Sequence, residues 1–500
     1  MPSGDHITTE TFVANYREAL ANPQLQRALT NATTRFTLGR QMAVDGVGAE
    51  WEPLREQARA IKAHTIVNLD HYLEEFSKRI EELGGSVFWA QDSKEANAYI
   101  TGLARQNGVT LAVKSKSMMT EEIELNRALA SVACEGLETD LGEYIIQLAG
   151  ERPSHIIAPA IHKTRGDVAD LFAEKLGVER NDEIERMTAI ARRVLRQRFA
   201  SAGMGVTGCN FAVAETGTIV LVENEGNIRL TNSLPRIHVA LLGIEKVVPR
   251  LEDVAAFLRL LPRSASGQKM SAYVSFLTGV KRSPTDEGPE ELHVVILDNG
   301  RTEALGNPHL RESLYCIRCG ACLNACPVYQ KIGGHAYGWI YPGPIGSVLT
   351  PQLIGRARAA DLPFASSLCG ACREVCPIKI NIPDMLLQLR HEIHRGSKEP
   401  DSEARQSTSR PGAQSMRRLK HRAASALERL VFRLWAGAMS TRGRYVAATR
   451  IARLFSRTLA SDGRALPAPG WTSTRELPPL AEQSFRDIWP DLASEHGRKG

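Results

Sequence analysis

The sequence predicts an α/β protein built from four consecutive parts: a helical N-terminal region, an α/β domain, an α-helical cysteine-rich module and a basic helical C-terminal region with an extended tail. Three observations support this. Apolar residues recur at helical spacing at first, short apolar runs then alternate with helical segments, and seven of the nine cysteines lie close together after the alternation ends. We expect the boundaries at 1–84, 85–300, 301–395 and 396–500.

The helical region leads directly into a strand-helix-strand unit. Leu73, Phe76, Ile80 and Leu83 follow a spacing of about 3.6 residues, which is typical of one face of a helix. The period then changes, and the next segments predict a strand, a helix capped by Asp92 or Ser93, and a second strand: Ser86–Ala90, Lys94–Gln106 and Thr110–Val113. Strands joined by a helix predict a parallel sheet.

The alternation continues to about residue 300. We expect further strands at Glu143–Gln147, His155–Pro159, Ala212–Val213, Thr218–Val222, Ile237–Leu241 and Leu292–Ile296. We expect helices near Arg165–Leu176, Asp182–Ala202 and Leu251–Leu261. The run Gly203–Gly208 matches a dinucleotide-binding fingerprint in its letters, but it follows a helix instead of a strand, so a glycine-rich turn is the favoured interpretation.

Polar clusters in this domain give the candidates for substrate chemistry. Lys114 and Lys116 follow a strand and precede a helix, where cations and a helix N-terminus can bind a carboxylate or phosphate. Glu215 lies in a turn between strands and is the candidate base. Asn224–Arg229 predicts a tight hairpin turn. Solvated loop charges and ordinary turn chemistry are the alternatives, and spacing alone favours them.

Two cysteine runs carry the most specific signal. The first run has the C-x2-C-x2-C-x3-C-P spacing of iron–sulfur proteins, in which three thiolates bind one cluster and the fourth binds another. Crossed ligation then assigns Cys316, Cys319, Cys322 and Cys376 to one cluster and Cys326, Cys369 and Cys372 to the second. Zinc is the less favoured alternative, because zinc sites take four ligands and these cysteines number seven.

The second cluster lacks one cysteine. Ser366 stands where a complete second motif would have its first cysteine. Two hypotheses follow: a 3Fe-4S cluster, or a 4Fe-4S cluster whose last iron binds Ser366, water or another ligand. The glycine- and proline-rich segment between the runs, Gly333–Gly346, predicts an irregular loop.

Charge is concentrated at the C-terminal end. The net charge is +6, and between Asp401 and Leu466 fourteen Arg and Lys face four Asp and Glu. Helices expected at Ala423–Leu434 and Tyr445–Leu459 suit an anionic membrane surface or a partner protein, whereas no base-reading motif favours nucleic acid. We find no signal peptide or membrane-spanning run, so we expect a cytoplasmic protein, with the inner membrane face as a further option.

Several motifs together resemble one family. The segments Val113–Met118, Glu138–Ile145 and Ala214–Thr218, and the cysteine runs with Gly-Gly-His-Ala-Tyr-Gly between them, resemble the bacterial lactate-utilisation iron–sulfur protein B family. The resemblance implies an α/β domain similar to the NagB/RpiA/CoA-transferase class, fused to a ferredoxin-like module with two clusters bound by the seven cysteines. It also implies a role in electron transport during oxidation of L-lactate to pyruvate, in a complex with companion lactate-utilisation proteins.

Two other functions remain open on the sequence. The α/β domain could itself bind substrate, with Lys114 or Lys116 holding the carboxylate and Glu215 acting as base. Alternatively, the chain is a membrane-peripheral iron–sulfur subunit of a quinone-linked dehydrogenase for another 2-hydroxy acid or glycerol phosphate.

Overall fold

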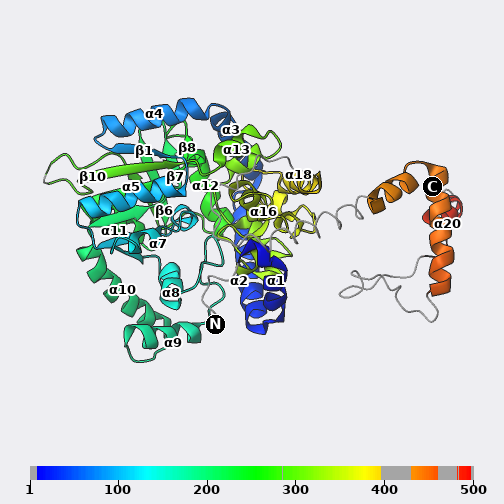
Figure 1. Cartoon of the computed structure of the whole chain (residues 1–500), viewed down its shortest axis with the longest axis horizontal. Coiled ribbons are helices and arrows are strands. Elements are labelled where there is room, and N and C mark those ends of the chain that lie inside the picture. The colour runs from blue at the N-terminus through cyan, green and yellow to red at the C-terminus, as the bar shows by residue number, and fades with distance from the viewer. Residues whose placement is uncertain (1–7, 284, 396–429, 460–480, 482, 497–500) are drawn as a thin grey trace, which may run out of the picture. The chain divides into compact units, whose positions relative to one another are not determined.

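The computed structural model describes residues 8–283, 285–395, 430–459, 481 and 483–496 (Figure 1). They fall into two compact units, with the boundary between Glu399 and Pro400. The first unit contains both sheets and both cysteine runs.

A six-stranded parallel sheet forms the centre of the first unit. Its order is β1, β10, β7, β4, β2 and β3, with bounds Ser86–Ala90, Glu291–Leu297, Ile237–Gly243, Met204–Thr207, Leu111–Lys114 and Glu135–Glu138. All five neighbouring pairs are parallel. The predicted parallel sheet is confirmed, although β1 and β2 are separated within it by three other strands.

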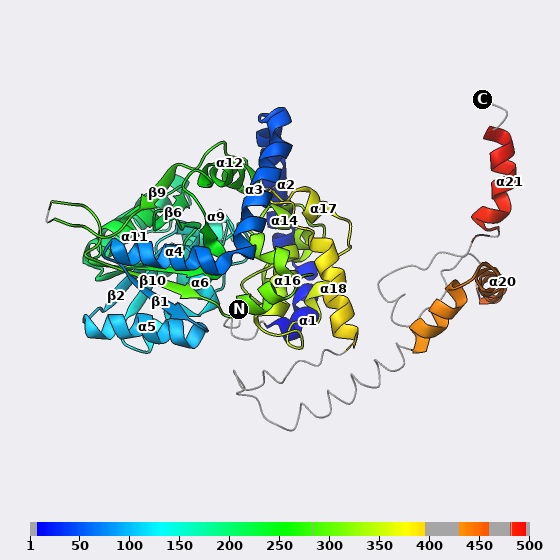
Figure 2. The ribbon, with the colours of Figure 1, turned by 90° about the horizontal axis from the view of Figure 1, so that it is seen from above.

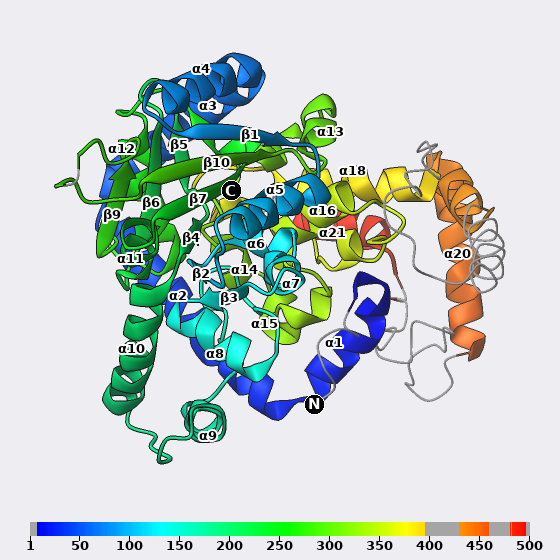
Figure 3. The same cartoon turned by 60° about the vertical axis from the view of Figure 1, so that its left-hand side comes forward.

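Both faces of this sheet are buried, as expected for parallel strands. Along β10, Val295 and Leu297 pack into one apolar cluster with helices α5 (Ser93–Gln106) and α7 (Leu125–Ala130). The alternate residues Val294 and Ile296 pack into a second, larger cluster on the other face. Helix α5 lies against β1 and β10 (Figures 1 and 3). Asp92 caps it by accepting hydrogen bonds from the amides of Lys94 and Glu95.

A second, four-stranded sheet belongs to the larger apolar cluster. Its order is β8, β5, β6 and β9, with bounds Val247–Val248, Phe211–Val213, Thr218–Glu223 and Tyr273–Leu277. The β5–β6 and β6–β9 pairs are antiparallel, and the turn at residues 214–217 joins β5 to β6 as predicted. Helix α12 (Val254–Ala265) packs on this sheet through Phe257, whose ring lies 4.9 Å from that of Phe211.

The N-terminal region is helical, as predicted. Its helices are α1 (Phe12–Ala21), α2 (Pro23–Asp45), α3 (Trp51–Val67) and α4 (Leu69–Glu82). Helix α2 contacts α12 of the α/β domain and α14 and α15 of the cysteine-rich module, while α3 contacts both β8 and the turn before the first cysteine run. Figure 2 shows α2 and α3 between the two regions. The apolar face of these helices therefore joins sheet and module into one core.

Short helices build the cysteine-rich module. They are α13 (Arg301–Gly306), α14 (Ala321–Asn324), α15 (Tyr329–Ile332), α16 (Gly343–Leu353), α17 (Ala371–Glu374) and α18 (Ile382–Arg395). The prediction of an irregular loop at Gly333–Gly346 is wrong in part, because a 3-10 turn at His335–Tyr337 and the first turn of α16 lie within it. Pro344 sits in the first turn of α16, where its missing N–H costs no hydrogen bond.

Two strand predictions in the α/β domain are wrong. Residues 143–147 lie in helix α8 (Leu141–Ala149), which Asp140 caps and Gly150 ends in a left-handed conformation. Residues 155–159 form a loop, because the His155 ring folds back and accepts hydrogen bonds from the amides of Ile157 and Ala158.

Two turn predictions are also wrong. The glycine-rich segment forms β4, where a side chain at Gly205 would meet the carbonyl of Thr231 at 1.8 Å, so helix α11 can pack tightly over the strand. The expected hairpin at residues 224–229 is instead the start of α11 (Asn227–Ser233). In the first turn of α11, the amides of Ile228 and Arg229 donate to the two carboxylate oxygens of Glu223.

The second unit contains helical residues 430–439, α20 (Arg442–Leu459) and α21 (Phe485–His496). The predicted helix at Tyr445–Leu459 is confirmed, whereas residues 423–429 and most of the expected tail lie outside the described residues. Helices α20 and α21 meet through Arg453 and Asp487, 3.3 Å apart. In the part of the chain that the structure describes, no helix has the length and hydropathy to cross a membrane.

Candidate iron–sulfur site

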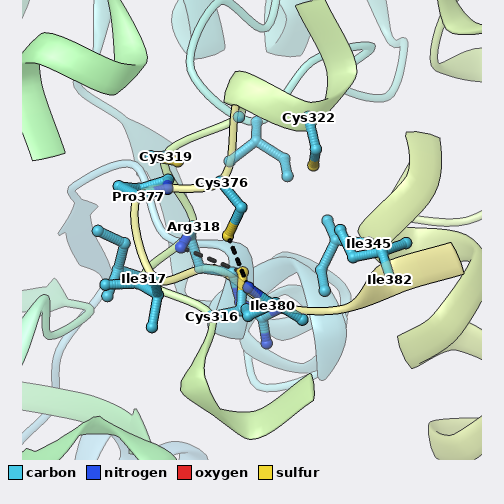
Figure 4. A pocket seen from close by; sticks show the side chains of 13 residues that line it. Cys316, Ile317, Arg318, Cys319, Cys322, Ile345, Cys376, Pro377, Ile380 and Ile382 are labelled. Carbon is cyan, nitrogen blue, oxygen red and sulfur yellow. Dashed lines mark hydrogen bonds between the residues drawn. The ribbon is translucent and has the colours of Figure 1, made fainter. Parts of the chain in front are cut away.

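Four of the predicted cluster cysteines surround one cavity. Cys316, Cys319 and Cys322 come from the first run and Cys376 comes from the end of the second (Figure 4). Apolar side chains complete the wall, among them Ile345 and Ile382. The structure thus brings together the four cysteines that crossed ligation assigns to one cluster.

Backbone amides point at two of these sulfurs. The amide of Arg318 donates to Cys316 Sγ and the amide of Ile380 donates to Cys376 Sγ, both at 3.4 Å. Arg318 and Lys379 each adopt a positive φ, of 60° and 53°. This backbone shape turns the chain around the sulfur. Amides arranged in this way stabilise negative charge on cysteine sulfur and on a cluster bound to it.

The burial of these thiols tests whether they fit a metal cluster. Burial raises the pKa of Cys319 and Cys322 above the usual range, and it raises the pKa of Cys376 to about 11. Such thiols ionise only when a cation binds them. Four cysteine thiols that line one cavity beside apolar side chains fit the four-thiolate ligation of an iron–sulfur cluster.

The other three cysteines form a second set with a different exposure. Cys326 and Cys372 are buried, whereas Cys369 is exposed. The three lie close enough together for their charges to influence one another. Burial raises the pKa of Cys372 to about 12, while the amide of Ala371 and the Ser367 side chain lower that of Cys369. The sets are neighbours, because α14 contacts α17 and Cys322 interacts electrostatically with Cys372.

Buried charges connect the first set to the α/β domain. Arg318 lies 3.3 Å from Glu245 and stacks 4.4 Å from the centre of the Tyr341 ring. Glu245 also pairs with Arg301, which binds Glu122 through a second ion pair, each at 2.8 Å. These cations outweigh the effect of burial and hold the pKa of Glu245 at about 2. A network of buried ion pairs therefore extends from Arg318, beside the first set, to Glu122 of the α/β domain.

The N-terminal helices hold the backbone of the second run. The guanidinium of Arg55, in α3, donates to the carbonyl oxygens of Glu374 and Cys376 at 2.9 and 2.7 Å. Arg40, in α2, donates to the carbonyl of Val375 at 3.0 Å. We did not predict these residues from the sequence. The sequence gives only one sign of their role, which is that arginine stands on the apolar side of each helix. Charge pattern alone does not distinguish such an arginine from one on a solvated face.

His155 supports the first run from the α/β side. Its Nε2 donates to Asn324 Oδ1 at 3.2 Å, and a side chain at Gly320 would meet its ring at 3.3 Å. Burial lowers its pKa to about 3, so the ring is neutral at physiological pH. It acts here as a packing and hydrogen-bonding residue.

The three candidates for substrate chemistry do not converge. Lys114 is fully buried, and its Nζ lies 2.5 Å from Glu138 and 3.5 Å from Glu121. Burial acts to lower its pKa, but these carboxylates outweigh burial and raise it. Glu215 belongs to the other sheet, accepts a hydrogen bond from the amide of Leu251 and lines a separate cavity with Tyr72.

Lys116 has a different environment from Lys114. It interacts electrostatically with Glu143, Glu225 and His155, at the carboxyl edge of the six-stranded sheet. Burial raises the pKa of Glu143 well above its usual range and that of Glu225 to about 7. This edge therefore places a cation beside two carboxyl groups whose pKa values are raised, a combination that suits an anionic ligand.

Family models match most of the chain. They are the LUD domain over residues 73–297, the 4Fe-4S dicluster domain over 312–380 and the C-terminal domain of lactate utilisation protein B over 402–492. A protein from Bacillus cytotoxicus named lactate utilization protein B is 41% identical over 498 residues, which cover 99% of both chains. This chain belongs to the lactate utilization protein B family.

A second member, from Bacillus thuringiensis, is also 41% identical, over 97% of this chain and 98% of its own. A crystal structure of a DUF162 family protein from Deinococcus radiodurans aligns with 46% of this chain and 98% of its own, at 15% identity and a TM-score of 0.25. Within the family assignment, the α/β part is a LUD domain and the cysteine-rich part is a 4Fe-4S dicluster domain.

Proposed function

We propose that this protein carries electrons through two iron–sulfur clusters during the oxidation of L-lactate to pyruvate. Support comes from the two neighbouring cysteine sets, the dicluster domain and the names of the relatives. A cluster bound by thiolates accepts or donates single electrons, so the two-electron oxidation of a hydroxy acid needs a further cofactor. We assign that cofactor to a companion lactate-utilisation protein, with this chain as one component of the complex.

Each cysteine set has its own part in the proposal. Cys316, Cys319, Cys322 and Cys376 bind a 4Fe-4S cluster, and Cys326, Cys369 and Cys372 bind the second cluster. The single observation that carries the first of these assignments is the cavity lined by cysteines from both runs. The amides of Arg318 and Ile380 and the charge of Arg318 stabilise the added negative charge when an electron arrives.

Exposure suggests the direction of the electron path. The first set lies against buried side chains of the LUD domain, whereas the second includes the exposed Cys369. Contact between α14 and α17 makes the two sets neighbours, which supports electron transfer between them. We infer that one redox partner binds near Cys369.

The remaining assignments follow from the same reasoning. We propose domain boundaries at residues 84, 300 and 395, and a NagB/RpiA/CoA-transferase-like fold for the α/β part, supported by its parallel sheet. We propose that the basic C-terminal helices contact a partner protein or the inner face of the membrane. The charge excess of the tail supports this contact.

An anaerobic stopped-flow experiment tests the function. The reconstituted protein is mixed with L-lactate, alone and with the companion proteins, and visible cluster absorbance is followed. Bleaching only with the companions is the expected result. Cys322→Ser should abolish it, while the matched control Cys134→Ser, a buried cysteine outside both sets, should not.

Two other outcomes would contradict the proposed function. Bleaching by lactate alone would place the oxidation within this chain and direct attention to Lys116 and Glu143. No bleaching under either condition would contradict the lactate assignment, and a quinone-linked dehydrogenase for another 2-hydroxy acid or glycerol phosphate would then be tested.

A further inference from the structure

The second cysteine run repeats the backbone of the first at an offset of fifty residues. Three amide hydrogen bonds of the first run have counterparts in the second with nearly equal lengths. In the first run, the amides of Leu323, Ala325 and Cys326 donate to the carbonyl oxygens of Gly320, Ala321 and Leu323 at 3.0, 3.2 and 3.2 Å. In the second run, the amides of Arg373, Val375 and Cys376 donate to those of Gly370, Ala371 and Arg373 at 2.9, 3.1 and 3.3 Å. The two runs therefore share one local fold.

The unusual backbone angles repeat as well. Arg318 has a φ of 60° and Leu368 one of 56°, although neither is a glycine. Gly320 and Gly370 follow with 74° and 87°. A non-glycine residue at positive φ is uncommon, so its recurrence at the same position of both runs indicates that each run adopts the same cluster-binding conformation.

Ser366 occupies the place that Cys316 has in the first run. Cys316 Sγ accepts a hydrogen bond from the amide two residues later, that of Arg318, at 3.4 Å. Ser366 Oγ accepts the corresponding bond from Leu368 at 3.1 Å. The shorter distance is expected for oxygen, which is smaller than sulfur. The hydroxyl oxygen is therefore held at the position of the sulfur of a first cluster cysteine.

Contacts from α18 hold this serine in place. Arg390 donates to the carbonyl oxygens of Ser366 and Pro363, at 3.1 and 2.9 Å. Ser366 is half-buried, whereas the adjacent Ser367 is exposed. The Ser367 side chain is directed to Cys369, whose pKa it helps to lower. Of these two serines, only Ser366 has the hydrogen bond that marks the ligand position.

We propose that Ser366 Oγ is the fourth protein ligand of the second cluster, which is then a complete 4Fe-4S cluster. This inference rests on the proposed binding of that cluster by Cys326, Cys369 and Cys372. On ligation, the Oγ–H bond breaks, an Fe–O bond forms and the proton passes to solvent, with no change of oxidation state. An alkoxide is a harder donor than a thiolate, so it stabilises the oxidised cluster and lowers its reduction potential.

The test uses the full chain, reconstituted anaerobically with iron and sulfide. Wild type is compared with Ser366→Ala, Ser366→Cys and the control Ser201→Ala, an exposed serine outside the cysteine-rich module, by iron content, Mössbauer and EPR spectra, and redox titration. We expect wild type and Ser201→Ala to contain two four-iron clusters. Ser366→Ala should lose about one iron atom per chain and show the EPR signal of an oxidised three-iron cluster. Ser366→Cys should keep all its iron and raise the potential of one cluster only.

Two results would overturn the proposal. A three-iron cluster in wild type would show that Ser366 binds no iron. Iron content, spectra and potentials of Ser366→Ala equal to those of wild type would show that water or another group is the fourth ligand. Failure of the underlying cluster assignment looks different, because Cys372→Ala would then leave the iron content unchanged. Far-UV circular dichroism of each variant checks that the chain is folded.

Discussion

The two cysteine runs share a backbone conformation, but the two cysteine sets that they form differ in their surroundings. Around the first set lie the buried Arg318 and Glu245 and the ring of His155. Around the second set, Cys369 is exposed, and a side chain at Gly370 would meet nothing within 4 Å. One motif has thus been placed in two environments. The spacing of the last three cysteines is the same in both runs, whereas contacts with the LUD domain and the N-terminal helices set the burial and the charge around each set.

Loss of one cysteine from each set should give the largest difference in stability between the two sets. Cys319→Ala should lose the iron of the first set and lower the free energy of unfolding by about 3 kcal/mol or more, because a buried metal site contributes directly to folding. Cys369→Ala, at an exposed position, should cost about 1 kcal/mol. Iron analysis and anaerobic urea unfolding measure both effects. Equal losses in the two variants would show that the difference in burial has no energetic consequence.

Acid should weaken the support of the first set through His155. Its pKa is lowered from 6.5 to about 3 by burial, so between these pH values the unfolded chain binds a proton that the folded chain does not. Stability is therefore lost as pH falls below 6.5, by about 2 kcal/mol at pH 5 from this residue.

The variant His155→Gln should lose correspondingly less stability between pH 7 and pH 5 in urea unfolding. The exposed His71 offers a matched control, and His71→Gln should keep the wild-type pH dependence. An unchanged pH dependence in His155→Gln would mean that this ring does not carry the acid sensitivity.

Removal of the Arg318 charge should affect the potential of one cluster only. Arg318 Nη1 is buried with no hydrogen-bond partner among the described residues, and the same side chain interacts electrostatically with Cys316. Arg318→Gln should lower the potential of the first cluster by about 60 mV, a tenfold change in the reduction equilibrium. Redox titration followed by EPR measures it. The exposed Arg373 beside Cys372 is the control, and an equal shift of both clusters would contradict the local effect.

Local patterns in the sequence predicted the parts of the molecule that depend on neighbouring residues. The two cysteine runs, the Asp92 cap and the first strand-helix-strand unit all follow from short spacings. The segment at residues 143–147 was mispredicted because a short apolar run suits a strand or a buried helix equally, and only the Asp140 cap and Gly150 decide for the helix. The strand at Gly205 was missed because this glycine indicates a turn, whereas in the structure it allows α11 to pack closely on the strand.

Long-range contacts were beyond the reach of such patterns. Arg55 reaches carbonyl groups of the second run across more than 300 residues of sequence. Glu215 and Lys114 looked equivalent as polar residues beside strands, but the strands belong to different sheets. Ser366 could be recognised as the missing position from spacing alone. Its hydrogen bond to Leu368, which gives that position a chemical meaning, required the three-dimensional structure.

The smallest expected effect compares the two equivalent glycines. Gly320 and Gly370 both have positive φ, so alanine should cost each about 1 kcal/mol of unfolding free energy. At Gly320 the added methyl group would also meet the His155 ring at 3.3 Å, whereas space is open at Gly370. We therefore expect Gly320→Ala to cost about 1 kcal/mol more than Gly370→Ala. Anaerobic urea unfolding of both variants measures the difference. Equal costs would show that the His155 ring moves away from the added methyl group without a loss of stability.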